Sequence, residues 1–95
     1  MVQDEIKLIE IFNALGDTTR FKLYTLLVTE DICVGQLAER LKISSACVSQ
    51  HMKILSDANL IKRVRKGQRV CYQINSLPIN NQVVNNLIFK KGVPL

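Results

Sequence analysis

The apolar residues of this sequence change their spacing near residue 60, and this change limits the fold more than any other feature. Before it, apolar residues recur at three- and four-residue steps, which predicts helices over about 4–15, 18–28, 34–41 and 45–58. After it, Val70, Tyr72 and Ile74 alternate with other residue types behind a glycine-containing turn at 65–68, as in a β-hairpin. The sequence therefore predicts a mainly α fold with one small hairpin.

Local signals set the ends of these elements. Asp17 or Thr18 can cap the second helix, and Ser44 can cap the fourth. The third and fourth helices are joined by only three or four residues, so 34–58 has the outline of a helix-turn-helix and the hairpin at 61–75 that of a wing. Segment 79–90 can form a further amphipathic helix, which makes about five. The residues expected to face the core are Phe21, Leu23, Tyr24, Leu27, Leu37, Ala38, Leu41, Val48, Met52 and Leu55.

Size and composition narrow the class of protein. Residues 1–95 suit a single folded domain, since 47 % of them are hydrophobic. No apolar stretch is long enough to span a membrane, and the start MVQDEIK lacks the basic region of a signal peptide, so we expect a cytoplasmic protein with no membrane partner. The three cysteines are an odd number with no C-x-x-C pair, which predicts reduced thiols.

The charge of the chain is concentrated in the hairpin. The formal net charge is +5, and segment 61–72 contains no acidic residue. Such a run is either a solvated face or a surface for phosphates. Its basic residues are Lys62, Arg63, Arg65, Lys66 and Arg69.

The fourth helix has a polar outer face when Val48, Met52 and Leu55 point inward. Small or polar side chains there suit the base edges of the DNA major groove, because bulky apolar groups would leave donors and acceptors unpaired. An ordinary solvated face is the alternative for a single helix, but the basic hairpin behind it favours DNA. The predicted contact residues of this face are Ser45, Ala46, Ser49, Gln50 and Lys53.

Over residues 10 to 75 the sequence resembles the ArsR/SmtB family of winged helix-turn-helix transcriptional repressors. The family's Asp-x-Thr-Arg helix start is matched at 17–20 and its V-x-x-L-A-x-x-L helix at 34–41. The recognition helix V-S-x-H-L-x-x-L is matched at 48–55 with Met52 in place of Leu, and the usual A-G-L-V stands here as ANLI with Asn59 at the glycine. Asn is the residue that next best tolerates a left-handed backbone.

This resemblance implies a homodimer held by the first and last helices, 1–15 and 79–90. Such a dimer binds a twofold-related operator in double-stranded DNA and leaves it when an inducer binds. The family positions for base contact fall on Ser45, Ala46, Ser49 and Gln50, and His51 occupies the usual histidine position as a structural residue.

The inducer sites common in the family are incomplete in this chain. Arsenic-sensing members carry C-V-C with a third cysteine, whereas this sequence reads CVGQLA and keeps only Cys33. The zinc site on the last helix needs Asp and His, and 79–95 contains neither. Cys33 is therefore a weak metal candidate, and no cofactor is implied beyond a thiophilic metal or metalloid ion.

A second use of Cys33 depends on strand pairing. If 32–34 pairs with the second arm of the hairpin, Ile32 and Val34 face the core while Cys33 and Cys71 both point outward. Opposite residues lie about 4.5 to 5.5 Å apart at Cα, which allows a disulfide, a polysulfide bridge or two ligands of a thiophilic ion. A paired-thiol sensor, a metalloid site shared with the other subunit, and inert cysteines remain as alternatives.

Two other classes of function are compatible with the sequence. Cys47 and His51 lie four residues apart on one helix, as in a nucleophilic thiol enzyme, but no orienting third residue is evident, so we expect that the protein is not an enzyme. A chromatin-like protein would bind any duplex equally, whereas a repressor prefers its operator by about 10³-fold or more.

Overall fold

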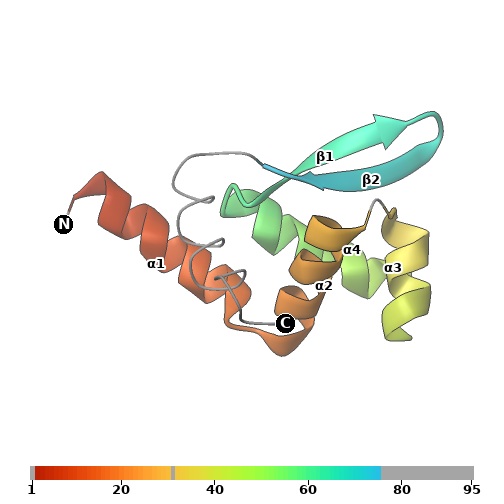
Figure 1. Cartoon of the computed structure of the whole chain (residues 1–95), viewed down its shortest axis with the longest axis horizontal. Coiled ribbons are helices and arrows are strands. Elements are labelled where there is room, and N and C mark those ends of the chain that lie inside the picture. The colour runs from red at the N-terminus through yellow and green to blue at the C-terminus, as the bar shows by residue number, and fades with distance from the viewer. Residues whose placement is uncertain (1, 31, 76–95) are drawn as a thin grey trace.

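The computed structural model describes residues 2–30 and 32–75. It contains α1 (Gln3–Leu15), α2 (Thr18–Thr29), α3 (Val34–Leu41) and α4 (Ser45–Asp57), followed by β1 (Ile61–Lys66) and β2 (Arg69–Ile74) (Figure 1). The predicted mainly α fold with a hairpin is confirmed. The helix expected at 79–90 lies outside the described residues.

Side-chain caps and left-handed residues place the element boundaries. The Asp17 carboxylate accepts a hydrogen bond from the Arg20 backbone N–H at 3.0 Å, and Ser44 Oγ accepts one from the Cys47 N–H at 3.0 Å. The bond from Arg20 lowers the pKa of the Asp17 carboxyl. Asn59 has φ 61°, as predicted from its place in ANLI, and Gly67 has φ 65° in the hairpin turn.

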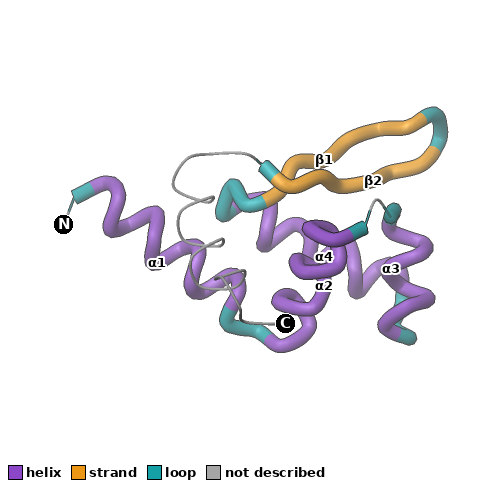
Figure 2. Tube along the Cα trace, in the orientation of Figure 1, coloured by secondary structure: helices purple, strands orange, loops and turns teal. Residues whose placement is uncertain are grey.

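The core lies where the four helices meet the base of the hairpin. The predicted inward residues of α2, α3 and α4 are confirmed, with Leu41 and Phe21 partly buried at its edge. Figure 2 shows the hairpin along one side of the helices, and its first residue, Ile61, is 1 % exposed. The base of the hairpin is therefore anchored in the core, while its turn is exposed.

Helix α1 leaves part of its apolar surface exposed. Ile6, Ile9 and Phe12 are 38 %, 45 % and 50 % exposed, whereas Ile11 and Ala14 are buried. The described part of the chain covers only the stripe of α1 that faces α2 and α4. A second apolar stripe of this helix is left open to solvent.

The hairpin is regular, and a third segment joins it at a single point. β1 and β2 pair antiparallel from Ile61 opposite Ile74 to Lys66 opposite Arg69. The segment expected at 32–34 forms one antiparallel bridge, between Cys33 and Cys71. The start of α3 is thus held directly against β2.

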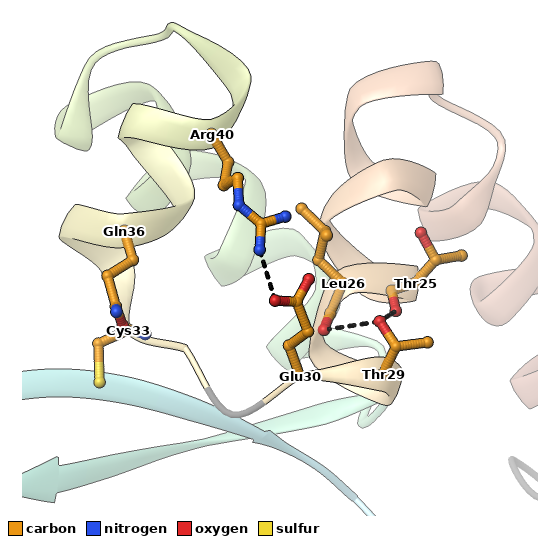
Figure 3. Close-up of polar contacts among 7 residues, drawn as sticks. All are labelled: Thr25, Leu26, Thr29, Glu30, Cys33, Gln36 and Arg40. Atoms are coloured by element: carbon orange, nitrogen blue, oxygen red, sulfur yellow. Dashed lines mark hydrogen bonds and ion pairs between the residues drawn. The ribbon is translucent and has the colours of Figure 1, made fainter.

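Polar contacts fix α3 in this position (Figure 3). The Gln36 side-chain oxygen accepts a hydrogen bond from the Cys33 backbone N–H at 3.0 Å, which caps the helix start. Arg40 forms an ion pair with Glu30 just after α2, and Thr29 Oγ1 donates to the Thr25 carbonyl at 3.0 Å. The Arg40–Glu30 pair therefore ties the last turn of α3 to the end of α2, while Gln36 caps the start of α3 locally.

Candidate nucleic-acid interface

The outer face of α4 is exposed along its whole length. Val48, Met52 and Leu55 are 0 % exposed on the opposite side and fix the rotation of the helix. The predicted contact residues all lie open to solvent: Ser45, Ala46, Ser49, Gln50 and Lys53. Small side chains at the helix start leave room for a close approach of a partner surface.

Lys53 already has a partner within its own helix. Its Nζ lies 3.0 Å from a carboxylate oxygen of Asp57, one turn further on, and the two side chains are 77 % and 67 % exposed. An exposed pair of this kind contributes little to stability, on the order of 0.3–0.5 kcal/mol. The amine can therefore leave Asp57 for a stronger anion such as a phosphate.

The hairpin presents its basic residues to solvent. Arg63 lies opposite Tyr72 and Arg65 opposite Val70 in the register, so these four share one face of the hairpin. No acidic residue occurs between 61 and 74 to neutralise them. The exposed basic residues are those predicted: Lys62, Arg63, Arg65, Lys66 and Arg69.

A groove of about 720 Å³ separates the hairpin from α4. It is lined by four elements, namely the start of α3, the outer face of α4 and the two strands of the hairpin. The polar and sulfur-bearing residues that line it are Cys33, Ser49, Lys53, Ser56, Asp57, Arg63, Arg69 and Tyr72. This groove is not predictable from the sequence, because no local pattern indicates where distant elements meet.

Cys33 and Cys71 are joined by a disulfide, with their Cα atoms 4.3 Å apart. Two expectations are corrected here. These two cysteines are not free thiols, since the bridge between α3 and β2 brings them into bonding distance. Cys71 does not point to an outer face either, because it is 1 % exposed beneath Cys33 and the start of α3, whereas Cys33 itself is only partly buried.

The third cysteine and the histidine lie apart from this bridge. Cys47 is free and partly buried near the start of α4. His51 has a buried Nδ1 that finds no hydrogen-bond partner among the described residues. The structure thus gives no Cys47–His51 hydrogen bond of the kind that activates a nucleophile.

Within one subunit, the described residues offer no donor set that suits a metal or metalloid ion. In residues 2–30 and 32–75, no three His, Cys, Asp or Glu side chains gather closely enough to hold one. The sulfur of Cys33, the weak metal candidate, is already bonded to the sulfur of Cys71. Within the same residues, no helix has the length and apolar character needed to cross a membrane.

Comparison with known proteins identifies relatives over most of the chain. Residues 17–63 match the model of the bacterial regulatory proteins of the arsR family. The transcriptional repressor SdpR of Bacillus subtilis is 36 % identical over 73 residues, which cover 77 % of this chain and 81 % of SdpR. The arsenical resistance operon repressor of the same organism is 36 % identical over 83 residues, which cover 84 % and 79 % of the two chains.

A solved structure agrees with the fold. The ArsR-like transcriptional regulator from Rhodococcus sp. RHA1 superposes with a TM-score of 0.76 at 27 % identity, over 90 % of this chain and 80 % of that one.

Proposed function

This chain belongs to the ArsR family of bacterial regulatory proteins, and from that premise we propose that it is a dimeric repressor that reads a specific DNA operator. The observation that carries the proposal is the exposed outer face of α4 beside a hairpin with five basic residues and no acidic ones. One surface then combines a helix that can contact base edges with a hairpin that can contact phosphates, and DNA-binding proteins need both kinds of contact.

The division of roles follows from side-chain chemistry. Gln50 can pair with adenine through two hydrogen bonds, and Ser49 can bond either a base edge or a phosphate. Ser45 and Ala46 allow the start of α4 to approach the groove floor. The hairpin cations and Lys53 hold phosphates, which adds affinity without sequence preference.

Dimerisation is supported by the open stripe of α1. Ile6, Ile9 and Phe12 are all exposed and lie on one side of the helix. They therefore form a continuous apolar patch, and such patches mark interaction surfaces. A second copy, with the segment 79–90 of each chain taking part, is the partner we propose for this stripe. Two α4 helices related by a twofold axis then reach half-sites about 34 Å apart.

The test is the affinity of the reduced protein for the DNA upstream of its own gene against a shuffled duplex of the same composition. A preference of about 10³-fold or more supports a repressor. Equal affinity for both duplexes contradicts it and leaves a chromatin-like protein that binds DNA without regard to sequence.

We further propose that the Cys33–Cys71 pair is the inducer-responsive element. The bond ties the start of α3 to β2, next to the groove between α4 and the hairpin. In the reduced state the hairpin can adjust to the DNA backbone, whereas the disulfide restricts it. A two-electron thiol oxidant that forms the bond therefore releases the operator, by a coupling on the order of 1–3 kcal/mol.

The redox proposal is tested with diamide as oxidant and dithiothreitol as reductant. Affinity for the operator falls on oxidation and recovers on reduction in the wild-type chain, and does neither in Cys33→Ser or Cys71→Ser. Cys47→Ser is the matched control and responds like the wild type. A response that survives in Cys33→Ser refutes the role of the pair.

A further inference from the structure

The two cysteines of the disulfide differ in how far solvent can reach them. Cys71 is 1 % exposed, whereas Cys33 is partly exposed and lines the groove between α4 and the hairpin. A thiolate that breaks a disulfide must reach one sulfur directly, and access decides which sulfur is attacked. The groove leads to Cys33, so attack at Cys71 is blocked by the protein itself.

The groove has the charge and the size to select the attacking molecule. Lys53, Arg63 and Arg69 line it against a single carboxylate, that of Asp57. In the described part of the chain, Arg63 and Arg69 have no ion-pair partner. At about 720 Å³ it falls within the range of small-molecule sites, about 300–1,000 Å³. Next to Cys33, a Cβ added at Gly35 would meet nothing within 4 Å, so the approach is open.

We infer that Cys33 is an S-thiolation site that accepts an anionic low-molecular-weight thiol in the groove between α4 and the hairpin. The incoming thiolate bonds to Cys33 Sγ, the Cys33–Cys71 bond breaks, and Cys71 leaves as a thiolate that takes a proton from water. In the reduced protein the Cys33 thiolate attacks the symmetrical disulfide of the same small thiol and releases one thiolate of it. Both routes give the same mixed disulfide, and neither needs a further oxidant or reductant.

The mixed disulfide has a consequence that the internal disulfide lacks. It places a negatively charged group between Ser49 and Lys53 on one side and Arg63 and Arg69 on the other. This consequence rests on the proposed DNA-binding function, because the groove opens between the two elements assigned to bases and phosphates. The adduct then repels the DNA backbone and neutralises the cations that would hold it.

The site is tested without DNA, in chains that keep one cysteine each. In a Cys47→Ser background, Cys71→Ser leaves only Cys33 and Cys33→Ser leaves only Cys71. Both are treated with glutathione disulfide and followed by intact mass and peptide mapping, with circular dichroism as the check on folding. Cys33 is expected to be modified at least about tenfold faster, because the other thiol is covered. Equal rates in two folded chains overturn the inference.

The preference of the groove for an anionic thiol is tested on the oxidised chain. All three cysteines are kept, so the test does not depend on whether cysteine variants fold. The disulfide is reduced with glutathione and with neutral 2-mercaptoethanol. Arg63→Gln with Arg69→Gln is expected to slow glutathione by about threefold or more and leave 2-mercaptoethanol unchanged. Lys62→Gln with Arg65→Gln removes the same charge outside the groove and should slow glutathione less. Equal slowing by the two pairs overturns the role of the groove.

The DNA consequence is measured last, on the single-cysteine chain that carries the glutathione adduct. Loss of affinity for operator and shuffled DNA alike supports the whole inference. An adduct that forms at Cys33 but leaves DNA affinity unchanged keeps the modification site and overturns the proposed DNA surface, so the two failures are distinguished.

Discussion

Reduction of the Cys33–Cys71 disulfide is expected to lower stability by a large and calculable amount. The two cysteines are 38 residues apart in sequence, and the bond closes a loop that includes all of α3 and α4. In the chain-entropy treatment, a loop of this length removes about 13 cal/mol/K from the unfolded state, or about 4 kcal/mol at 25 °C. For a domain of this size that corresponds to a fall in Tm of roughly 15–30 °C.

The folded state itself should survive reduction. The main core cluster includes neither cysteine, and it continues through α1, α2, α3, α4 and the first residue of β1. The loss therefore falls on the unfolded chain, which regains its freedom, more than on the packing of the folded one. A reduced protein that is less stable but still folded is what a reversible switch requires.

The assay is thermal unfolding followed by circular dichroism, with and without a reductant at equal protein concentration, since dimerisation makes Tm depend on concentration. Cys47→Ser is the control and should show the full difference between the two conditions. A variant with both Cys33→Ser and Cys71→Ser should unfold like the reduced wild type in either condition. The loop-closure reasoning is refuted if the oxidised and reduced wild type unfold within about 5 °C of each other.

Three further predictions concern single side chains. Burial raises the pKa of Tyr24 to about 12, so the stability that depends on its neutral form is present below about pH 10 and is lost as the pH rises. Tyr24→Phe should therefore lose about 1 kcal/mol less than the wild type in unfolding free energy between about pH 9 and 11, measured by urea titration. The pKa of Asp17 is lowered, so its contribution is present above about pH 4 and lost in acid. Asp17→Asn keeps an acceptor but cannot titrate, and its acid unfolding should begin at lower pH. Gln50→Ala should reduce operator preference, whereas Arg65→Ala should weaken binding to every duplex and reduce the salt slope by about one. Equal losses on operator and shuffled DNA for Gln50→Ala would contradict base readout.

Features that depend on neighbours in sequence were predictable, and those that depend on distant partners were not. The helix starts at Thr18 and Ser45 follow from the capping residues just before them, and the left-handed Asn59 follows from its place in ANLI. The Lys53–Asp57 ion pair is also predictable from the sequence, because oppositely charged residues four apart on a helix are neighbours. These rules act within one turn of the chain.

The burial of Cys71 shows where such reasoning ends. Neighbouring residues of a strand point to opposite faces, so Cys71 and Tyr72 lie on different faces of β2. Because Tyr72 is expected to face the core, the pattern predicts that Cys71 faces solvent. Alternation tells which residues share a face but not whether a second element covers the other face. Here the start of α3, 38 residues earlier, covers it. Whether Cys33 and Cys71 are adjacent depends on this same contact, so the sequence alone does not decide it.

The position of the disulfide bears on how an inducer signal could reach DNA. In many regulators the effector site and the DNA surface are far apart, and the coupling must pass through a bistable element. In this chain Cys33 lines a groove whose opposite walls are the outer face of α4 and the basic hairpin. A small-thiol adduct on Cys33 therefore acts on the proposed DNA surface by direct occupation and by charge. Such a coupling should persist when α1 is altered, because α1 does not line the groove. Ile9→Glu should disrupt the proposed dimer, and the local mechanism is refuted if glutathione disulfide no longer lowers the DNA affinity of the reduced variant.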